Sequence, residues 1–280
     1  MRYTLFYSAA PYVCLIFGLI MGSFFNVCIY RIPLNIFWKS SRSFCVHCGT
    51  PIPFWLNVPI LSYISLGGKT RCCSKPIPIQ YPLVELFSGL LFAFLYWRYP
   101  FLQKNALTLE GFNSWEFLRF THAAIFSSFL LVCSVIDIKH MIIPDVLSLP
   151  MIFLGPLMAL IHPELPVFDS LIGALLGAGS IYLIAWIYFL VRRREGIGMG
   201  DAKLLAAIGA WLGYTSLVPT VLFASLVGSL VGVILMFIKK QFDFQTEIPF
   251  GPFLSLGAAI YLLSPMHWME MVTKLTSLFS

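Results

Sequence analysis

Long apolar runs constrain the fold of this chain more than any other feature. Eight stretches with few charged side chains recur along the sequence, and each approaches the length of a helix that crosses about 30 Å of hydrocarbon. Their approximate limits are residues 11–30, 81–99, 120–136, 141–161, 169–191, 202–217, 218–238 and 250–266. The runs are continuously apolar, so they predict helices rather than the alternating strands of a barrel. The fourth run contains three prolines and the sixth is short, so we expect both to be kinked or partly unwound.

The composition indicates the same class of protein. Hydrophobic residues make up 59% of the 280 residues and charged residues 11%, which lies outside the range of soluble globular domains. We therefore expect an all-α polytopic membrane protein with about eight transmembrane helices. The net charge of +6 is explained by basic loops on the inner face that can contact anionic lipid. Membrane lipid is thus an expected partner, and nucleic acid is not.

The distribution of basic residues predicts the orientation of the helices. With the N-terminus outside, eight crossings place thirteen of the eighteen Lys and Arg residues in cytoplasmic loops. They are Arg31, Lys39, Arg42, Lys69, Arg71, Lys75, Lys139, Arg192, Arg193, Arg194, Lys203, Lys239 and Lys240. The positive-inside rule therefore favours an outside N-terminus and an outside C-terminus. Two aspartates, Asp137 and Asp201, then lie at the cytoplasmic edge.

Residues 31–80 depart from the membrane pattern. They are rich in Pro, Ser, Gly, Cys and basic residues, and six prolines argue against a long helix. Such a segment has too little apolar core to fold alone. We expect three parts: a first transmembrane helix at residues 1–30, a cytoplasmic loop module at 31–80 between the first and second helices, and a membrane-embedded bundle at 81–280.

Four of the seven cysteines lie in this loop module. Cys45 and Cys48 form a C-x-x-C pair, and Cys72 and Cys73 follow some two dozen residues later. Together they could form a tetrahedral site for structural zinc, which would organise a loop without a core. A disulfide is not expected, because cytosolic reductants keep thiols reduced. Zinc and free thiols are both open as alternatives at this point, with His47 as a substitute ligand.

Asp137 and Asp201 are costly residues to place near hydrocarbon. An ionised carboxylate there costs about 2.5–3.5 kcal/mol, so such residues usually face a polar cavity and have a function. Asp201 follows Gly198 and Gly200. Two positions without side chains would let an extended peptide approach the Asp201 carboxylate.

A pair of close carboxylates can act as acid and base. Both cannot ionise comfortably, so one proton is shared and the pair titrates as a unit. The ionised member can take a proton from water while its partner protonates the carbonyl oxygen of a peptide. Such a pair would hydrolyse a peptide bond without a metal or a covalent intermediate.

Structural roles are the alternative for these aspartates. Aspartates at helix ends cap the helix or pair with neighbouring lysines, which here are Lys139 and Lys203. Asp145 is a rival for the first catalytic position. It follows Pro144, however, and we expect it to cap the fourth helix.

Taken in order, five motifs of the chain resemble those of the bacterial type IV prepilin peptidases, which belong to the GxGD class of membrane aspartyl proteases. The motifs are Gly22 to Val27 with Tyr30 to Pro33, Cys45 to Pro53, Tyr81 to Leu86, Asp137 with Ile143 to Asp145, and Gly198 to Lys203.

The resemblance implies an endopeptidase that removes the basic leader from prepilins and pseudopilins at the cytoplasmic face of the bacterial inner membrane. It implies that Asp137 and Asp201 are the catalytic pair and that proteolysis requires no cofactor. Many members of the family also methylate the new N-terminal residue with S-adenosylmethionine. That activity is associated with the large cytoplasmic loop.

By the same resemblance, Gly68, Lys69 and Glu85 are candidates for contacts with the cofactor or with the amine that is methylated. A purely structural role is the alternative for Glu85, since an intramembrane glutamate can pair with an Arg or Lys of the loop. Lys203 is expected to orient Asp201 or to bind lipid headgroups.

The second cysteine pair departs from the family pattern. Family members usually carry a second C-x-x-C. When residues 75–77 are aligned with the family pattern, Cys73 falls at the last cysteine of that pair and Thr70 at the first. Cys72 is then a replacement ligand if zinc is bound.

Two other classes of function are alternatives. A transporter or channel also has acidic residues and broken helices, but it predicts carboxylates near the midplane and inverted halves, and no repeat is visible between the halves. A noncatalytic factor that captures pilins would share the loop module and would tolerate the loss of either carboxylate.

Overall fold

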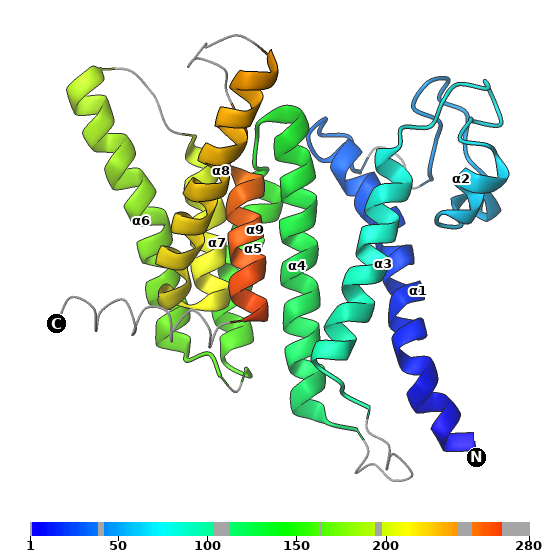
Figure 1. Ribbon diagram of the computed structural model, residues 1–280, viewed down its shortest axis with the longest axis horizontal. Coiled ribbons are helices and arrows are strands. Elements are labelled where there is room, and N and C mark those ends of the chain that lie inside the picture. Colours follow the sequence, from blue (N-terminus) through cyan, green and yellow to red (C-terminus); the bar gives the residue numbers. More distant parts are fainter. Residues whose placement is uncertain are drawn as a thin grey trace. The chain divides into compact units, whose positions relative to one another are not determined.

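The computed structural model describes residues 2–38, 42–102, 112–162, 164–193, 198–239 and 248–264. Within these ranges the regular structure is helical, and β-pairing is limited to isolated bridges (Figure 1). The chain divides into two compact units, Met1–Ser128 and Phe129–Ser280. The long helix α4 (Ser114–His140) begins in the first unit and ends in the second. The predicted all-α class is confirmed.

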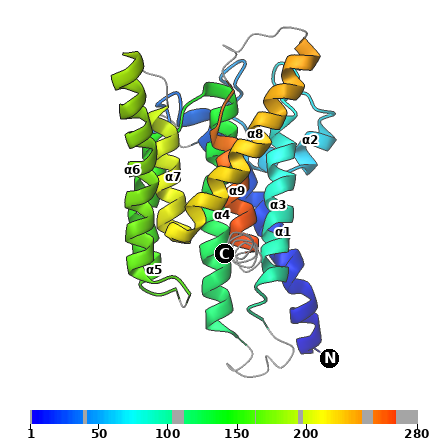
Figure 2. The same cartoon turned by 60° about the vertical axis from the view of Figure 1, so that its left-hand side comes forward.

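Two long helices frame the first unit. They are α1 (Arg2–Arg31) and α3 (Gln80–Arg98), which lie side by side in both views (Figures 1 and 2). Glycine permits their close approach: a Cβ added at Gly22 would lie 2.6 Å from the Cα of Glu85. Gly22 therefore allows the backbone that carries Glu85 to pack directly on α1.

The loop module between α1 and α3 contains little regular structure. Its described residues form the short 3-10 helix η1 (Phe54–Asn57) and the five-residue helix α2 (Leu61–Ser65). The prolines of this segment predicted the absence of a long helix, and the described part of the module has none. Its backbone is held by turns and by two isolated bridges, Phe44 with Pro51 and Lys69 with Pro76.

The second unit is a helical bundle to which the last part of α4 belongs. Its other elements are α5 (Asp145–Ala159), α6 (Val167–Arg192), α7 (Met199–Leu212), η3 (Tyr214–Ser216), α8 (Leu217–Lys239) and α9 (Gly251–Leu263). Helix α7 forms the core: an unbroken series of its residues, from Leu204 to Trp211, is buried. It packs against α5, α6 and α9.

Two glycines let α6 and α7 meet backbone to backbone. A Cβ added at Gly173 would collide with the carbonyl of Gly209, and one added at Gly209 would collide with the carbonyl of Gly173. The Ser170 hydroxyl donates a hydrogen bond to the carbonyl of Ala210 at the same contact. Small residues at a helix interface are the usual way in which helices approach closely within a membrane.

The described helices match the expected apolar runs in part. Four helical segments are long and apolar enough to cross a membrane. They are Ala9–Arg31, Ser114–His140, Val167–Val191 and Tyr214–Ile238. The other four expected runs correspond to the shorter helices α3, α5, α7 and α9. The count of eight crossings and the orientation of the termini therefore stay predictions.

The α6–α7 contact predicts a large stability difference between two similar substitutions. Gly209→Ala should lower the free energy of unfolding by about 1–3 kcal/mol, because the added methyl group overpacks a rigid backbone contact. Gly179→Ala on α6 is the matched control, since its Cβ would meet nothing within 4 Å. Thermal unfolding of the purified variants in detergent measures the difference. Equal melting temperatures for the two variants would contradict the described contact.

Candidate functional site

Asp137 lies one turn before the end of α4, and its side chain is buried with 5% exposed. The helix ends just after it because Met141 adopts a left-handed conformation with φ 53°. The Met141 N–H donates to the Asp137 carbonyl at 2.8 Å, a common way for a helix to end. The chain then turns through Ile143 into α5.

A backbone N–H at the start of α9 holds the Asp137 carboxylate. The Gly251 N–H donates to Asp137 Oδ2 at 3.0 Å. A Cβ added at Gly251 would lie 2.7 Å from the same oxygen, so glycine alone permits this contact without a shift of the carboxylate. The unpaired N–H groups of a helix N-terminus favour an anion at this position.

Asp201 lies in the first turn of α7, and its side chain is partly exposed. Its backbone N–H donates to the Gly198 carbonyl at 3.1 Å, which closes the turn into the helix. Among the described residues, its carboxylate has neither a hydrogen bond nor an ion pair. The charge of Asp201 interacts with that of Asp137.

Ile143 packs between the segments that carry the two aspartates. A Cβ added at Gly200 would lie 3.3 Å from the Cβ of Ile143, and one added at Gly251 would lie 3.4 Å from its Cδ1. One apolar side chain thus contacts the backbone next to Asp201 and the backbone that holds Asp137. This packing keeps the polar groups of the site beside an apolar wall.

The prediction that Asp145 caps the helix is wrong, and Lys203 has a different carboxylate partner from the expected one, while its alternative role at lipid headgroups stays a prediction. Lys203 forms an ion pair with Asp145, not with Asp201, because it lies two residues further along α7 and so points to a different side of that helix. Asp145 does not cap α5 through its side chain, because Pro144 occupies the N-cap position and Asp145 begins the first turn. Asp137 likewise forms no ion pair with Lys139 within the described residues.

The arrangement has the properties of an acid–base pair. Its two carboxylates interact with each other and have no basic partner among the described residues, so a shared proton is the available way to reduce their repulsion. One member is held by a backbone N–H, and the other has no fixed hydrogen bond in the part of the chain that the structure describes. A Cβ added at Gly198 would lie 3.6 Å from Asp201 Oδ2, so glycine leaves this side of the carboxylate uncovered.

The four loop cysteines come together as the sequence predicted. The sulfur atoms of Cys45, Cys48, Cys72 and Cys73 all lie within 4.8 Å of one another. Cys45 lies 3.8 Å from Cys73, and Cys48 lies 3.2 Å from Cys72. Four thiolates around zinc at about 2.3 Å would be about 3.8 Å apart, so this set fits a tetrahedral ion.

Two loops of similar construction carry these cysteines. In the first, the Cys45 N–H donates to the Thr50 carbonyl and the Gly49 N–H to the Cys45 carbonyl. In the second, the Thr70 N–H donates to the Lys75 carbonyl and the Ser74 N–H to the Thr70 carbonyl. Gly49 and Ser74 both have positive φ, 71° and 55°. The two loops are therefore a structural repeat, which the sequence did not reveal because only a few positions are similar.

The repeat shows how the second loop departs from C-x-x-C. Thr70 occupies the position that Cys45 has in the first loop, and Cys73 the position of Cys48. Cys72 therefore reaches the cluster from the position of His47. The Thr70 hydroxyl lies 3.1 Å from the Cys73 sulfur, so it contacts the cluster without supplying a thiolate.

Neighbouring hydroxyl and thiol groups change the acidity of three of these thiols. Hydrogen bonding to Thr50 lowers the pKa of Cys48 to about 6. Hydrogen bonding to Thr70 lowers the pKa of Cys73 from its ordinary value. The contact with the Cys48 sulfur raises the pKa of Cys72 to about 12, because a proton held there stabilises the neighbouring thiolate.

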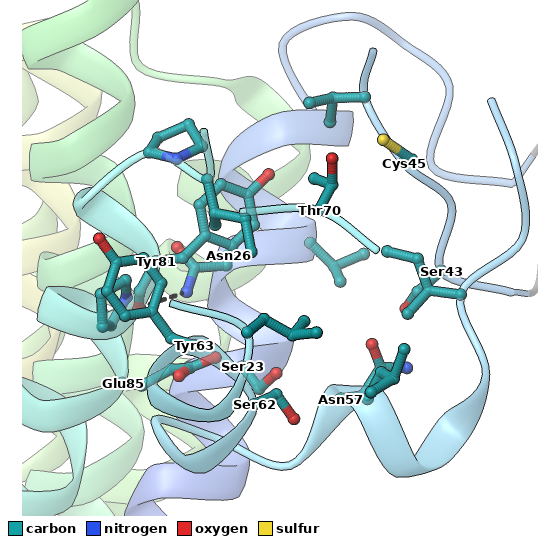
Figure 3. Close-up of a pocket in the computed structure, with 18 of the residues that line it drawn as sticks. Ser23, Asn26, Ser43, Cys45, Asn57, Ser62, Tyr63, Thr70, Tyr81 and Glu85 are labelled. Atoms are coloured by element: carbon teal, nitrogen blue, oxygen red, sulfur yellow. Dashed lines mark hydrogen bonds between the residues drawn. The ribbon is translucent and has the colours of Figure 1, made fainter. Parts of the chain in front are cut away.

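Glu85 lies at a cavity of about 170 Å³ between the loop module and helices α1 and α3 (Figure 3). No Lys, Arg or His among the described residues forms an ion pair with Glu85, and Lys39 of the loop lies outside those residues. Gly68 and Lys69 are not among the residues that line the cavity. Gly68 instead has a left-handed φ of 70°, and its N–H donates to the carbonyl of Tyr63, a residue that does line the cavity.

Two residues of these sites have roles that the sequence patterns above do not predict. Gly251 lies in an apolar run, although the Gly-Pro pair at the start of that run is a signal for a helix N-terminus. Asn26 lies within the first of the five motifs, which gives it no role. It lines the cavity beside Glu85 (Figure 3).

Comparison with known proteins places the chain in a family. Residues 16–99 match the bacterial Peptidase A24 N-terminal domain, and residues 124–233 match the type IV leader peptidase family. No solved structure matches the chain.

Relatives named prepilin leader peptidase/N-methyltransferase cover most of the sequence. Those of Xanthomonas campestris, Pseudomonas aeruginosa and Pectobacterium carotovorum are 36%, 35% and 35% identical to it. The matches cover 86%, 93% and 89% of this chain, and 86%, 91% and 91% of the relatives. The chain belongs to the type IV leader peptidase family.

Proposed function

We propose that this chain cleaves the leader from prepilins and pseudopilins with Asp137 and Asp201 as the catalytic pair. The observation that carries the proposal is the pair itself: two carboxylates that interact with each other and have no cation beside them in the described residues. The names of the relatives supply the substrate class. A transporter or a noncatalytic pilin-binding factor has no support from these relatives.

The two carboxylates have different roles in peptide hydrolysis. The ionised carboxylate takes a proton from a water molecule, which attacks the peptide carbonyl, and the protonated carboxylate donates its proton toward the carbonyl oxygen. The Gly251 N–H holds Asp137 in place during this exchange. Gly198 and Gly200 would let the substrate backbone approach Asp201, whereas Lys203 pairs with Asp145 and with neither catalytic aspartate.

We place this reaction at the cytoplasmic face of the bacterial inner membrane. Four apolar helices and the relatives support an inner-membrane protein. The excess of basic residues in the loops expected inside supports external N- and C-termini. The proposed division into a first helix, a loop module at 31–80 and a bundle at 81–280 follows from the same topology.

The chain also methylates the new N-terminus in our proposal, with S-adenosylmethionine as the methyl donor. The N-methyltransferase activity in the names of the relatives supports this second reaction. The cofactor would supply an electrophilic methyl group. Glu85 lines the cavity beside the loop module, and Gly68 and Lys69 lie in the loop next to it. The Gly68 N–H donates to the carbonyl of Tyr63, which lines the cavity.

We further propose that Cys45, Cys48, Cys72 and Cys73 bind one structural zinc ion. The mutual distances of their sulfurs support a tetrahedral site. Zinc would supply cross-links between the two similar loops and so stabilise a module that lacks its own apolar core.

If the two carboxylates are catalytic, replacing either one with its amide should abolish leader cleavage. Asp137→Asn and Asp201→Asn should each lower the rate of leader removal by about 10²- to 10⁴-fold or more, because each amide prevents the sharing of a proton. The rate is measured by mass spectrometry of a purified prepilin incubated with the purified variant in detergent.

Asp145→Asn is the matched control for these variants. It removes a carboxylate from an exposed ion pair, which is worth about 0–1 kcal/mol, and should leave cleavage nearly unchanged. Normal cleavage by either catalytic variant, or loss of cleavage with Asp145→Asn alone, would contradict the assignment.

The cysteine cluster predicts metal content. The purified protein should contain about one zinc ion per chain, and Cys45→Ser, Cys48→Ser or Cys72→Ser should lower that content after dialysis against a chelator. Cys14→Ser, a buried position of α1, is the control and should retain zinc.

A double variant tests the role of Cys72 specifically. Thr70→Cys combined with Cys72→Ser restores a regular C-x-x-C and should regain the zinc that Cys72→Ser loses, because the two loops are built alike. Elemental analysis by mass spectrometry decides the result. If Cys72→Ser kept its full zinc content, Cys72 would not be a ligand.

A further inference from the structure

The cavity beside Glu85 has two buried hydrogen-bond acceptors on one side. The first is Asn26, which is 3% exposed. Its Nδ2 donates to the Tyr81 carbonyl at 3.0 Å, which fixes the orientation of the side-chain amide and turns Oδ1 away from Tyr81. Asn26 Oδ1 is buried and has no hydrogen-bond partner in the described structure. An unpaired buried acceptor is unfavourable unless a ligand or water supplies a donor.

The second acceptor is the Glu85 carboxylate, which is 8% exposed. Oε2 accepts the Ile60 N–H at 2.8 Å, and the Ser23 side chain also bonds to the carboxylate. No cation neutralises it among the described residues. Figure 3 shows Glu85, Ser23, Asn26 and Tyr81 grouped on one side of the cavity, with Ser43 and Asn57 of the loop module opposite.

The backbone that contacts Glu85 is strained. Ile60 has a φ of 60°, a value that a β-branched residue rarely adopts. Its N–H is the group that Glu85 accepts. Strain of this kind concentrates at binding and catalytic sites, where the surroundings hold a chain in position.

These groups select the chemistry of a ligand. Two acceptors that form no ion pair among the described residues favour a positively charged N–H donor, because the guanidinium in the lining, that of Arg31, is held instead by the Arg42 carbonyl and the ring of Phe44. Tyr30, Phe44, Tyr63 and Tyr81 line the same cavity and offer aromatic surface to an apolar group. The volume of about 170 Å³ is close to the 150 Å³ of an engineered cavity that binds benzene, so it holds a side chain of about one ring rather than a whole nucleoside cofactor.

We propose that this cavity binds the primary α-amine of the cleaved pilin together with its first side chain, and that Glu85 is the base for methyl transfer. The proposal rests on the N-methyltransferase function proposed above. Asn26 Oδ1 and the Glu85 carboxylate accept hydrogen bonds from the ammonium group, and Glu85 then takes one proton. The nitrogen lone pair forms the N–C bond to the methyl group, and the C–S bond breaks with its electron pair going to the sulfur of S-adenosylmethionine.

Other titratable groups also face the cavity and belong in the interpretation of any pH profile. They are Tyr30, Arg31, Cys45, His47, Tyr63 and Tyr81. The Arg31 guanidinium is held by the Arg42 carbonyl and by the ring of Phe44, and it forms no ion pair with Glu85. A titration that belongs to one of these groups will persist when Glu85 is replaced.

The test uses the full-length protein, S-adenosylmethionine and a synthetic leaderless pilin peptide with a free N-terminus. Glu85→Gln should lower methyl transfer about 10²-fold at pH 6.5, where the free α-amine, with a pKa of about 8, is protonated and needs a base. At pH 9 most of the amine is already neutral, so the deficit should shrink to less than about tenfold. Asn26→Leu should raise the KM for the peptide about tenfold with less effect on kcat, because it removes an acceptor but not the base.

Three controls separate this role from a structural one. Glu116→Gln, the same substitution at the partly exposed pair with Arg119, should change neither activity. Leader cleavage by Glu85→Gln should stay within about twofold of the unmodified protein. The dissociation constant for S-adenosylmethionine, measured by calorimetry, should also be unchanged in that variant. A deficit that is equal at pH 6.5 and pH 9 would overturn the role of base.

A small probe identifies the occupant of the cavity. L-phenylalaninamide should compete with the peptide and should lose its effect with Glu85→Gln, whereas N-acetyl-L-phenylalaninamide should not compete. Competition with S-adenosylmethionine instead, or weakened cofactor binding in Glu85→Gln, would show that the cavity holds the cofactor and would overturn the proposal. Absence of methyl transfer by the unmodified protein would refute the proposed methyltransferase function, and calorimetry with L-phenylalaninamide would then decide amine binding by itself.

Discussion

A buried carboxylate without a cation must be stabilised by other donors, and this constraint shapes both units of the protein. Asp137 accepts the N–H of Gly251, and Glu85 accepts the N–H of Ile60. In each case a glycine leaves the space that the carboxylate or its backbone requires, Gly251 beside Asp137 and Gly22 beside Glu85. One backbone N–H satisfies only part of a carboxylate, so each group keeps capacity for a further proton or donor. That remaining capacity is what acid–base chemistry needs.

The sequence predicted which residues form these sites better than it predicted which groups those residues contact. The aspartates, the glycines before Asp201 and the four loop cysteines are unusual in an apolar chain, so composition alone makes them candidates. Which groups meet depends on the packing of helices that are distant in the sequence. Lys203 is near Asp201 in the sequence but pairs with Asp145, because residues two positions apart on a helix point to different sides. The role of Gly251, which lies 114 residues after Asp137, could not be derived from local pattern.

The fold was predictable to a similar degree. Apolar runs indicate helices because the backbone must satisfy its hydrogen bonds internally in lipid, and the described chain is helical throughout its regular structure. The repeat of two similar loops was not predictable, because it resides in backbone hydrogen bonds and in the positive φ of Gly49 and Ser74. Those features tolerate different side chains. For this reason the displaced Cys72 looks irregular in the sequence and yet joins the cluster in the structure.

The thiol cluster and the cavity beside Glu85 share residues, and this has a consequence for the loop module. Cys45 and Thr70, which occupy equivalent positions in the two loops, both line the cavity. The described part of the module has no long helix and little apolar core of its own, so the geometry of that wall depends on what fixes the two loops to each other. A metal bound by the four thiolates would supply this cross-link about one side chain away from the ligand site. The metal would then determine the shape of the cavity and take no part in methyl transfer. The groups proposed for that reaction, Glu85 and Asn26, lie on the opposite side of the cavity, on helices α3 and α1, where Gly22 and Tyr81 position them.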